Sequence, residues 1–304
     1  MTGVDLFAGA GGFTTGAAGA GIQVLWAANH WRLAVDCHAG NHPETFHACQ
    51  DLHQADWSQV PAHDILMASP CCQGHARARG KDRPHHDLQR STAWAVVSCA
   101  EYHREEVVVV ENVSEFATWT LYPAWLDAMS RLGYVVSPHI VDAADHGVPQ
   151  HRVRLFLVCT RSKAPMILDL PTRQHASINE VIDWSYPDWS RIDKPGRSAA
   201  TLRRIASGRA RFGDRFVAPY YGTGSGTTGR SIHRPIGTIT TRDRWSIIDG
   251  NRMRMLQPQE AKLAMGFPAS YRIPKERQPA IHLLGNAVSP IVATDIFTEI
   301  RRTI

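Results

Sequence analysis

The chain has 304 residues, of which 43% are hydrophobic and 20% are charged. This length can bury a full core of one large or two modest domains, and the composition excludes a mostly disordered protein. No apolar run approaches the roughly 18 to 20 residues that span a bilayer, and the first residues do not resemble a cleavable leader. We therefore expect a cytoplasmic protein that makes no membrane contact. Six scattered cysteines without metal-ligand spacing predict mostly buried thiols and no metal site.

The positive charge is concentrated in one segment. The net charge is +5, whereas residues 161–250 alone hold 15 Lys and Arg against 8 Asp and Glu. The same segment contains several Trp and Tyr residues and a glycine-rich run at 222–229. These features favour binding to a polyanion with exposed groove edges or bases. A solvated arginine-rich surface is the alternative that the composition leaves open.

Up to about residue 160, short apolar runs alternate with longer helical stretches. The runs cover residues 3–7, 24–28, 65–68, 107–110, 135–140 and 155–159. This alternation is typical of a parallel, doubly wound α/β sheet.

The alternation breaks down between about 161 and 250, where prolines, glycines and arginines are frequent. Helical patterns return at 258–265 and 289–304. We therefore predict three segments: a first domain over 1–160, a smaller inserted domain over 161–250, and a return to the first domain over 251–304.

The first strand-like run leads directly into a glycine-rich loop, AGAGG at residues 8–12. Glycines permit a tight strand-to-helix turn and let backbone amides approach a ligand at a helix N-terminus. The spacing differs from the dinucleotide fingerprint, and no Lys-Ser/Thr pair follows as in a phosphate-binding loop. The loop therefore favours a nucleotide or nucleoside ligand, S-adenosylmethionine included, over a purely structural turn.

Three residues that follow the next strands can contact such a ligand. His30 stands where a nucleoside-binding protein usually offers an acid to the ribose hydroxyls, and a neutral His can also bond to them. Trp31 offers a ring on which adenine can stack, although core packing explains it nearly as well. Asp51, after the expected third strand, can accept a hydrogen bond from the adenine amino group.

A cysteine and a carboxylate follow two further strand-like runs. Cys72 lies in SPCCQ at residues 69–73, and Glu111 directly follows residues 107–110. Ligands of open α/β sheets bind outside the carboxyl ends of the strands, so the two side chains can converge on one small molecule. A thiolate adds to an electron-poor double bond, and an acid can protonate or hydrogen-bond the ring that it attacks. Taken alone, Cys72 is more simply read as an inert buried cysteine.

A run of polar residues completes the candidate site. With a strand period of two, Gln150, Arg152 and Arg154 point to one face. Two guanidiniums and an amide that enter a core are unfavourable unless they pair with carboxylates, phosphate or a polar ring. We interpret these residues as one wall of a binding site.

Six motifs, in this order, resemble those of the DNA (cytosine-5)-methyltransferase family. They are DLFAGAGGF at 5–13, SPCCQG at 69–74, ENV at 111–113, QHRVR at 150–154, RPIGTITT at 234–241 and GNAV at 285–288. The resemblance spans nearly the whole chain except about 161–230. It implies a doubly wound, mostly parallel, Rossmann-like methyltransferase sheet that binds S-adenosylmethionine, with a smaller inserted target-recognition domain.

The resemblance implies S-adenosylmethionine as the methyl donor, S-adenosylhomocysteine as its product, and a set of residues around them. The implied cofactor contacts are Phe7, Ala8, Gly9, Ala10, Gly11, Gly12, His30, Trp31, Asp51, Leu52, Ser69, Asn286, Ala287 and Val288. His30 departs from the family pattern, which has a ribose-binding acid at this position.

Catalytic roles follow from the same resemblance. Cys72 is implied to attack cytosine C6, Glu111 to contact N3 and the exocyclic amine, and Arg154 to hold the O2 side. Arg152 and Gln150 are implied to orient the site. Cys71 stands where the family has proline, so swapped roles of the two thiols stay open.

The implied partner is double-stranded DNA, from which the target cytosine is flipped into the site. The expected DNA contacts are Gln73, Arg77, Arg79, Thr240 and Thr241. We expect a monomeric prokaryotic or phage enzyme, which is either an orphan or part of a restriction-modification system with a separate endonuclease. Two alternatives stay open: an RNA (tRNA) cytosine-5 methyltransferase, and a catalytically silent relative that binds DNA.

Overall fold

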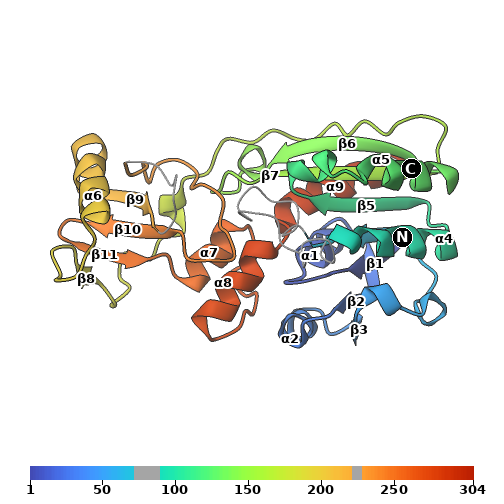
Figure 1. The fold of residues 1–304 in the computed structure, drawn as a ribbon, viewed down its shortest axis with the longest axis horizontal. Coiled ribbons are helices and arrows are strands. Elements are labelled where there is room, and N and C mark those ends of the chain that lie inside the picture. The colour runs from blue at the N-terminus through green and yellow to red at the C-terminus, as the bar shows by residue number, and fades with distance from the viewer. Residues whose placement is uncertain (72–89, 221–227) are drawn as a thin grey trace. The chain divides into compact units, whose positions relative to one another are not determined.

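The computed structural model describes residues 1–71, 90–220 and 228–304. These residues form two compact units (Figure 1). The first unit comprises residues 1–142, 153–171 and 287–304, and the second comprises residues 143–152 and 172–286.

The second unit extends to residue 286, whereas the sequence analysis places the return to the first domain after residue 250. The difference arises at α7 (Pro258–Ala264), whose helical pattern the sequence analysis assigns to the first domain. This helix packs against α8 (Arg277–Asn286) of the second unit. A helical pattern alone does not indicate against which unit the helix packs.

In the described part of the chain, the first unit contains a seven-stranded sheet. Its strands are β1 (Thr2–Leu6), β2 (Gln23–Asn29), β3 (Phe46–Cys49), β4 (Ile65–Ala68), β5 (Val107–Asn112), β6 (Val135–Asp142) and β7 (Val153–Thr160). Their order is β3-β2-β1-β4-β5-β7-β6 (Figure 1). Neighbours are parallel except that β7 runs antiparallel to both β5 and β6. The predicted doubly wound, mostly parallel α/β sheet is thereby confirmed.

The central strands explain why the sheet forms. Every residue of β4 and β5 is buried. Continuous apolar runs are typical of strands that are covered on both faces, and Val107–Val110 is such a run. Glu111 and Asn112 end β5 as polar residues inside this apolar environment. Their burial therefore needs a functional or hydrogen-bonding explanation.

Helices cover both faces of this sheet. Those among the described residues are α1 (Gly12–Gly19), α2 (Arg32–Asn41), α4 (Ala93–His103), α5 (Tyr122–Arg131) and α9 (Pro290–Thr303). On one face, α4 and α5 pack around the fully buried Trp125. On the other, Phe13 of α1 contacts Phe156 of β7 and Phe297 of α9. Gly16 permits α1 to approach α9 closely, because a Cβ at this position would lie only 2.4 Å from the Cβ of Ala293.

The second unit is built on a small antiparallel sheet. Its strands are β8 (Ser190–Arg191), β9 (Arg215–Pro219), β10 (Trp245–Asp249) and β11 (Arg252–Met255), in the order β8-β11-β10-β9. Helix α6 (Ala199–Phe212) packs on the sheet through Ile205 and the ring of Phe216. Gly208 permits this approach, because a Cβ there would lie 2.4 Å from that ring.

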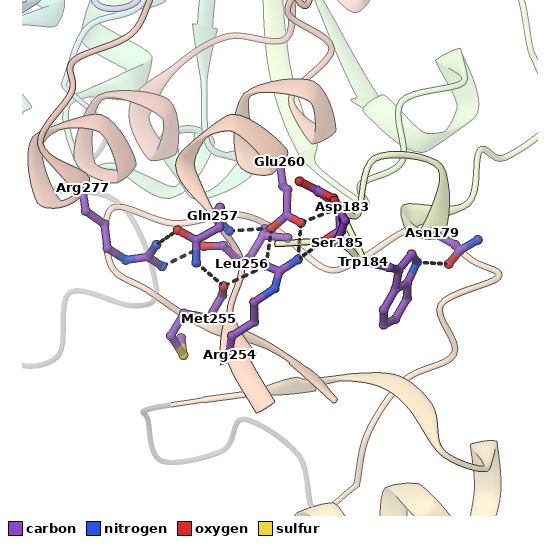
Figure 2. Close-up of polar contacts among 10 residues, drawn as sticks. All are labelled: Asn179, Asp183, Trp184, Ser185, Arg254, Met255, Leu256, Gln257, Glu260 and Arg277. Atoms are coloured by element: carbon purple, nitrogen blue, oxygen red, sulfur yellow. Dashed lines mark hydrogen bonds and ion pairs between the residues drawn. The ribbon is translucent and has the colours of Figure 1, made fainter. Parts of the chain in front are cut away.

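A buried ion pair joins β11 to α7 (Figure 2). Arg254 donates from Nη1 and Nη2 to the two carboxylate oxygens of Glu260, at 2.7 and 2.6 Å. The backbone N–H groups of Asp183 and Gln257 also donate to Glu260, at 2.8 and 2.6 Å. The two charged side chains are 1% and 4% exposed. The pair therefore anchors the small sheet, the segment before β8 and the start of α7 to one another.

Residues 277–303 are long and apolar enough to cross a membrane by length and composition. The structure divides this stretch into α8 and α9, and 78% of its apolar window is buried. Such burial is typical of helices in the core of a folded protein.

Candidate active site

The carboxyl ends of β4 and β5 lie side by side, because Ala68 pairs with Val110 in parallel register. The segment that leads to Cys72 therefore begins beside the acid that ends β5. Asn112 Nδ2 donates to the backbone oxygen of Pro70 at 3.1 Å, which ties the two strand ends together. The backbone N–H of Cys71 donates to Thr92 Oγ1 at 3.0 Å.

Glu111 and Arg154 form a nearly buried ion pair at this edge of the first unit. Arg154 Nε lies 3.0 Å from Glu111 Oε1, and the two side chains are 14% and 7% exposed. Strands β5 and β7 bring them together, because Glu111 pairs with Phe156 two residues further along β7. Arg154 Nη1 donates to the oxygen of Val153 at 2.8 Å. No described residue accepts a hydrogen bond from Arg154 Nη2.

Cys72, Gln73, Arg77 and Arg79 lie outside the described residues. Their predicted roles as nucleophile and DNA contacts therefore stay predictions. The described neighbours of Cys72 in the chain, Pro70 and Cys71, lie at the edge of the sheet where Glu111 lies.

The glycine loop between β1 and α1 adopts a left-handed conformation at three positions. The φ angles are 59° at Phe7, 53° at Gly9 and 81° at Gly11. Such angles are unfavourable for residues other than glycine, so Phe7 is held in place by its surroundings. Ser69 Oγ donates to the oxygen of Phe7 at 3.2 Å.

Gly12 begins α1 directly against the chain before α9. A Cβ on Gly12 would lie 2.0 Å from the backbone oxygen of Val288, so only glycine fits there. Ala287 and Val288 are both buried, at 4% exposure each. The first unit thus brings the glycine loop, Ser69 and this segment together. Asn286 is the exposed last residue of α8, in the second unit.

The segments after β2 and β3 lie at the same edge, since β1 pairs with β2 and β2 with β3 in parallel. His30 is exposed and Trp31 is half-buried. Asp51 accepts bonds from the backbone N–H and the ring of His53, at 3.0 and 2.8 Å, and these bonds lower the pKa of its carboxyl. Leu52 is buried. The exposed Asp51 is therefore an anion at neutral pH.

Gln150 and Arg152 precede β7 and belong to the second unit. Gln150 is fully buried, donates to the oxygen of Ala264 at 3.2 Å and accepts from the N–H of Ile239 at 2.6 Å. Arg152, 3% exposed, donates to the oxygens of Ile239 and Gly285, at 3.1 and 3.0 Å. Sequence periodicity places both residues on one strand with Arg154, but that strand begins only at Val153.

The predicted DNA contacts Thr240 and Thr241 follow the segment that Gln150 and Arg152 hold. Both threonines are half-buried, and Thr240 Oγ1 donates to the oxygen of Arg242 at 3.1 Å. A Cβ on Gly285 would lie 2.3 Å from the Thr241 nitrogen, so the turn packs closely on the end of α8.

Sequence reasoning missed one buried polar group beside the glycine loop. Asp5 is fully buried in β1, and burial raises the pKa of its carboxyl to about 7. Thr14 Oγ1 and its backbone N–H donate to this carboxyl. An acid inside the apolar run of residues 3–7 is the signal that points to a buried partner.

Known proteins match the chain over nearly its whole length. Type II methyltransferase M.HhaI of Haemophilus parahaemolyticus is 24% identical, over 94% of this chain and 89% of its own. Type II methyltransferase M.NlaX of Neisseria lactamica is 26% identical, over 94% of this chain and 91% of its own.

Solved structures share the fold. A putative DNA modification methyltransferase encoded within an E. coli prophage superimposes with a TM-score of 0.74 at 18% identity, over 99% of both chains. The Dnmt2 methyltransferase of S. pombe gives a TM-score of 0.69 at 15% identity, over 100% of this chain and 99% of its own.

The family model described as C-5 cytosine-specific DNA methylase matches residues 1–210 and 203–302. Members of this family are S-adenosylmethionine-dependent enzymes. The chain therefore belongs to the C-5 cytosine-specific DNA methylase family.

Proposed function

We propose that this chain transfers a methyl group from S-adenosylmethionine to C5 of a cytosine flipped out of a specific duplex DNA sequence. The observation that carries the mechanism is the buried edge where Glu111 pairs with Arg154 at 3.0 Å while Asn112 binds Pro70, two residues before Cys72. An acid, a cation and the approach to a thiol thus share one edge of the sheet.

The residues of this edge divide the reaction between them. The Cys72 thiolate adds to C6, which makes C5 nucleophilic, while Glu111 contacts N3 and the exocyclic amine. Arg154 fixes the Glu111 carboxylate through Nε, and its Nη2, from which no described residue accepts a hydrogen bond, can contact the O2 side of the ring. After methylation at C5, loss of the C5 proton and elimination break the C6–S bond and free Cys72. Gln150 and Arg152 act indirectly, by holding the segment around Ile239.

The residues around the glycine loop fit the cofactor. The left-handed turn at Gly9 and Gly11 and the close approach of Gly12 to Val288 bring backbone groups of the loop and of the segment before α9 together. Trp31 offers a half-buried ring and Asp51 an exposed anion at the same sheet edge. S-adenosylmethionine supplies an electrophilic methyl group when it is bound. With His30 in the place of an acid, we expect its ribose to be held by an imidazole ring.

The second unit suits DNA by its charge. The surface cavity of about 530 Å³ beside α6 is lined by Lys194, Arg197, Arg204 and Tyr220, among other residues. Cations of this kind neutralise phosphates and position a protein on a duplex without reading its sequence. We propose that Thr240 and Thr241, with Gln73, Arg77 and Arg79, make further DNA contacts. A monomeric cytoplasmic enzyme, alone or beside a separate restriction endonuclease, is the cellular form that we propose.

The test uses duplex DNA that carries 5-fluorocytosine, from which elimination is blocked because C5 bears no proton to lose. We expect the wild-type chain to form a covalent DNA adduct with S-adenosylmethionine, and C72A to form none. Bisulfite sequencing of DNA from cells that express the chain should show 5-methylcytosine at one short motif, absent with C72A. C71A is the matched control and should retain both. Methylation by C72A but not C71A would reverse the thiol assignment, and methylation of tRNA but not duplex DNA would refute the DNA substrate.

A further inference from the structure

A buried chain of hydrogen bonds joins four elements of the first unit beside the glycine loop. Thr14 Oγ1 lies 2.8 Å from Asp5 Oδ2 and 3.0 Å from His38 Nε2. His38 Nδ1 lies 2.7 Å from His47 Nε2. Asp5, Thr14 and His38 are 0%, 2% and 1% exposed. We call these four residues the Asp5–His47 chain; they come one each from β1, α1, α2 and β3.

Every link of the Asp5–His47 chain can be satisfied whether or not Asp5 is ionised. A hydroxyl has one hydrogen, and a neutral imidazole has one donor and one acceptor nitrogen. Burial holds the pKa of His38 well below its usual value, so its ring is neutral. When Asp5 is ionised, donors run from His47 through His38 and Thr14 to the carboxylate. When Asp5 is protonated, the same links run in the opposite direction after both His38 and His47 change tautomer.

Removal of one link therefore leaves a buried partner without its hydrogen bond. His42 and His47 are the titratable groups whose rings pack against His38, with ring centroids 4.8 and 4.9 Å from its own. His42 Nε2 also lies 3.1 Å from Thr15 Oγ1, next to Thr14 on α1. The first turn of α1 is thus bound to α2 and to the residue after it by side-chain hydrogen bonds.

The bond between Asp5 and Thr14 closes the ends of the glycine loop. Asp5 precedes the loop in β1, and Thr14 follows it in the first turn of α1. The loop between them holds Phe7 at a φ of 59°, an angle that a residue with a side chain rarely adopts. Its shape therefore depends on contacts that fix both ends.

The other two members hold the remaining segments that we assign to the cofactor. His38 lies on α2, which begins at Arg32 directly after Trp31. His47 lies on β3, which ends two residues before Asp51. The Asp5–His47 chain thus connects the glycine loop, the segment after β2 and the segment after β3.

We propose that Thr14 and His38 are positioning residues for the cofactor: through Asp5 and His47 they hold these three segments in the arrangement that binds S-adenosylmethionine. This inference rests on the proposed cofactor site. It predicts an effect on affinity for S-adenosylmethionine, with little effect on the chemical step once the site is filled.

The test compares variants that remove a link with variants that keep it. T14V removes the hydroxyl at nearly constant shape, and T14S retains it. H38L removes both ring nitrogens, whereas H38Q retains a donor for Thr14 at the distance of Nε2 and loses only the Nδ1 link to His47. Y134F is the matched control, because it removes a buried hydroxyl that donates to Glu105 at the amino ends of β5 and β6, away from the glycine loop.

We expect T14V and H38L to raise the Kd for S-adenosylmethionine about tenfold, which corresponds to about 1.4 kcal/mol of binding free energy. T14S should stay within about threefold of wild type, and H38Q, which keeps the Thr14 link and loses the His47 link, should bind more tightly than H38L and more weakly than wild type. The kcat at saturating cofactor should change little in all four variants. Y134F should lower the melting temperature and leave the Kd unchanged. Isothermal titration calorimetry of the full chain measures the Kd, and melting without cofactor establishes that each variant is folded. T14A replaces T14V if the latter does not fold.

A wild-type Kd in T14V, or an equal rise in Kd in Y134F, overturns the positioning role. So does a T14S variant that binds as weakly as T14V. These results leave the proposed function intact, provided that wild type binds S-adenosylmethionine and traps 5-fluorocytosine DNA. If wild type does neither, the proposed function itself fails.

Discussion

Replacing Glu260 by Gln should destabilise the second unit by several kcal/mol. Both terminal nitrogens of Arg254 donate to this carboxylate, and two backbone N–H groups donate to it as well (Figure 2). An amide has one oxygen acceptor and presents N–H donors on its other side, so the nearly buried Arg254 would face a donor and lose its counter-charge. Removal of one partner from a buried ion pair costs about 3 to 5 kcal/mol.

The assay must separate the two units, because a chain of two compact units does not generally unfold in one two-state transition. Hydrogen-deuterium exchange in increasing urea reports the opening free energy of peptides from each unit separately. We expect E260Q to lose protection in peptides from 172–286 and to keep it in peptides from 1–142. D193N is the matched control in the same unit, since the Arg191–Asp193 pair is 81% and 67% exposed, and it should leave protection unchanged. If E260Q loses no more protection than D193N, the ion pair does not hold the unit together.

Three further predictions concern the first unit. G12A places a Cβ 2.0 Å from the oxygen of Val288, so we expect S-adenosylmethionine binding to be lost; an unchanged Kd by calorimetry would contradict the close approach. The pKa of Asp5 rises from 3.8 in the unfolded chain to about 7 in the folded protein. Between these two pH values the folded state binds more protons than the unfolded state, so the free energy of unfolding falls as the pH rises, by about 4 kcal/mol in total. D5N should abolish this fall in urea unfolding between pH 4 and 7, and a variant with the wild-type pH dependence would show that Asp5 is not its source. R154A deprives Glu111 of its cation at 3.0 Å, and we expect kcat to fall about 10- to 100-fold in a methyl-transfer assay; a kcat within twofold of wild type would remove Arg154 from the mechanism.

The sheet of the first unit is largely predictable, because its strands are short apolar runs between helical stretches. Residues 65–68 and 107–110 form β4 and the first four positions of β5. Strand β3 is harder to detect, since Phe46–Cys49 is exposed or half-buried at every position and has no apolar run. Helix α8 escapes detection because Pro279 interrupts its pattern. The proline is tolerated there because it lies in the first turn, where its missing N–H has no intrahelical partner.

Whether a residue's role at the candidate site can be predicted depends on how far away its partners lie in the sequence. Glu111 can be identified from the sequence because it lies at the end of a strand, and ligands of an α/β sheet bind at the strand ends. The bonds of Arg152 reach residues 87 and 133 positions later, which no local pattern reports. The partnership of Thr14 with His38 likewise arises only when α1 packs beside α2. The sequence therefore identifies the side chains that react more readily than it identifies the residues that position them.

The three buried or nearly buried arginines around these sites differ in which of their donors are already used. Arg254 engages both terminal nitrogens with Glu260 and with backbone oxygens, and Arg152 engages both of its own with backbone oxygens. The terminal nitrogens of these two guanidiniums bind protein oxygens, so replacement of either arginine should act through stability and positioning. Arg154 binds Glu111 through Nε and Val153 through Nη1, and no described residue accepts from its Nη2. A cation that is held at the ligand edge of the sheet, with one donor that binds no residue in the described part of the chain, is suited to bind substrate. We therefore infer that Arg154 contacts the cytosine, whereas Arg152 holds the segment around Ile239.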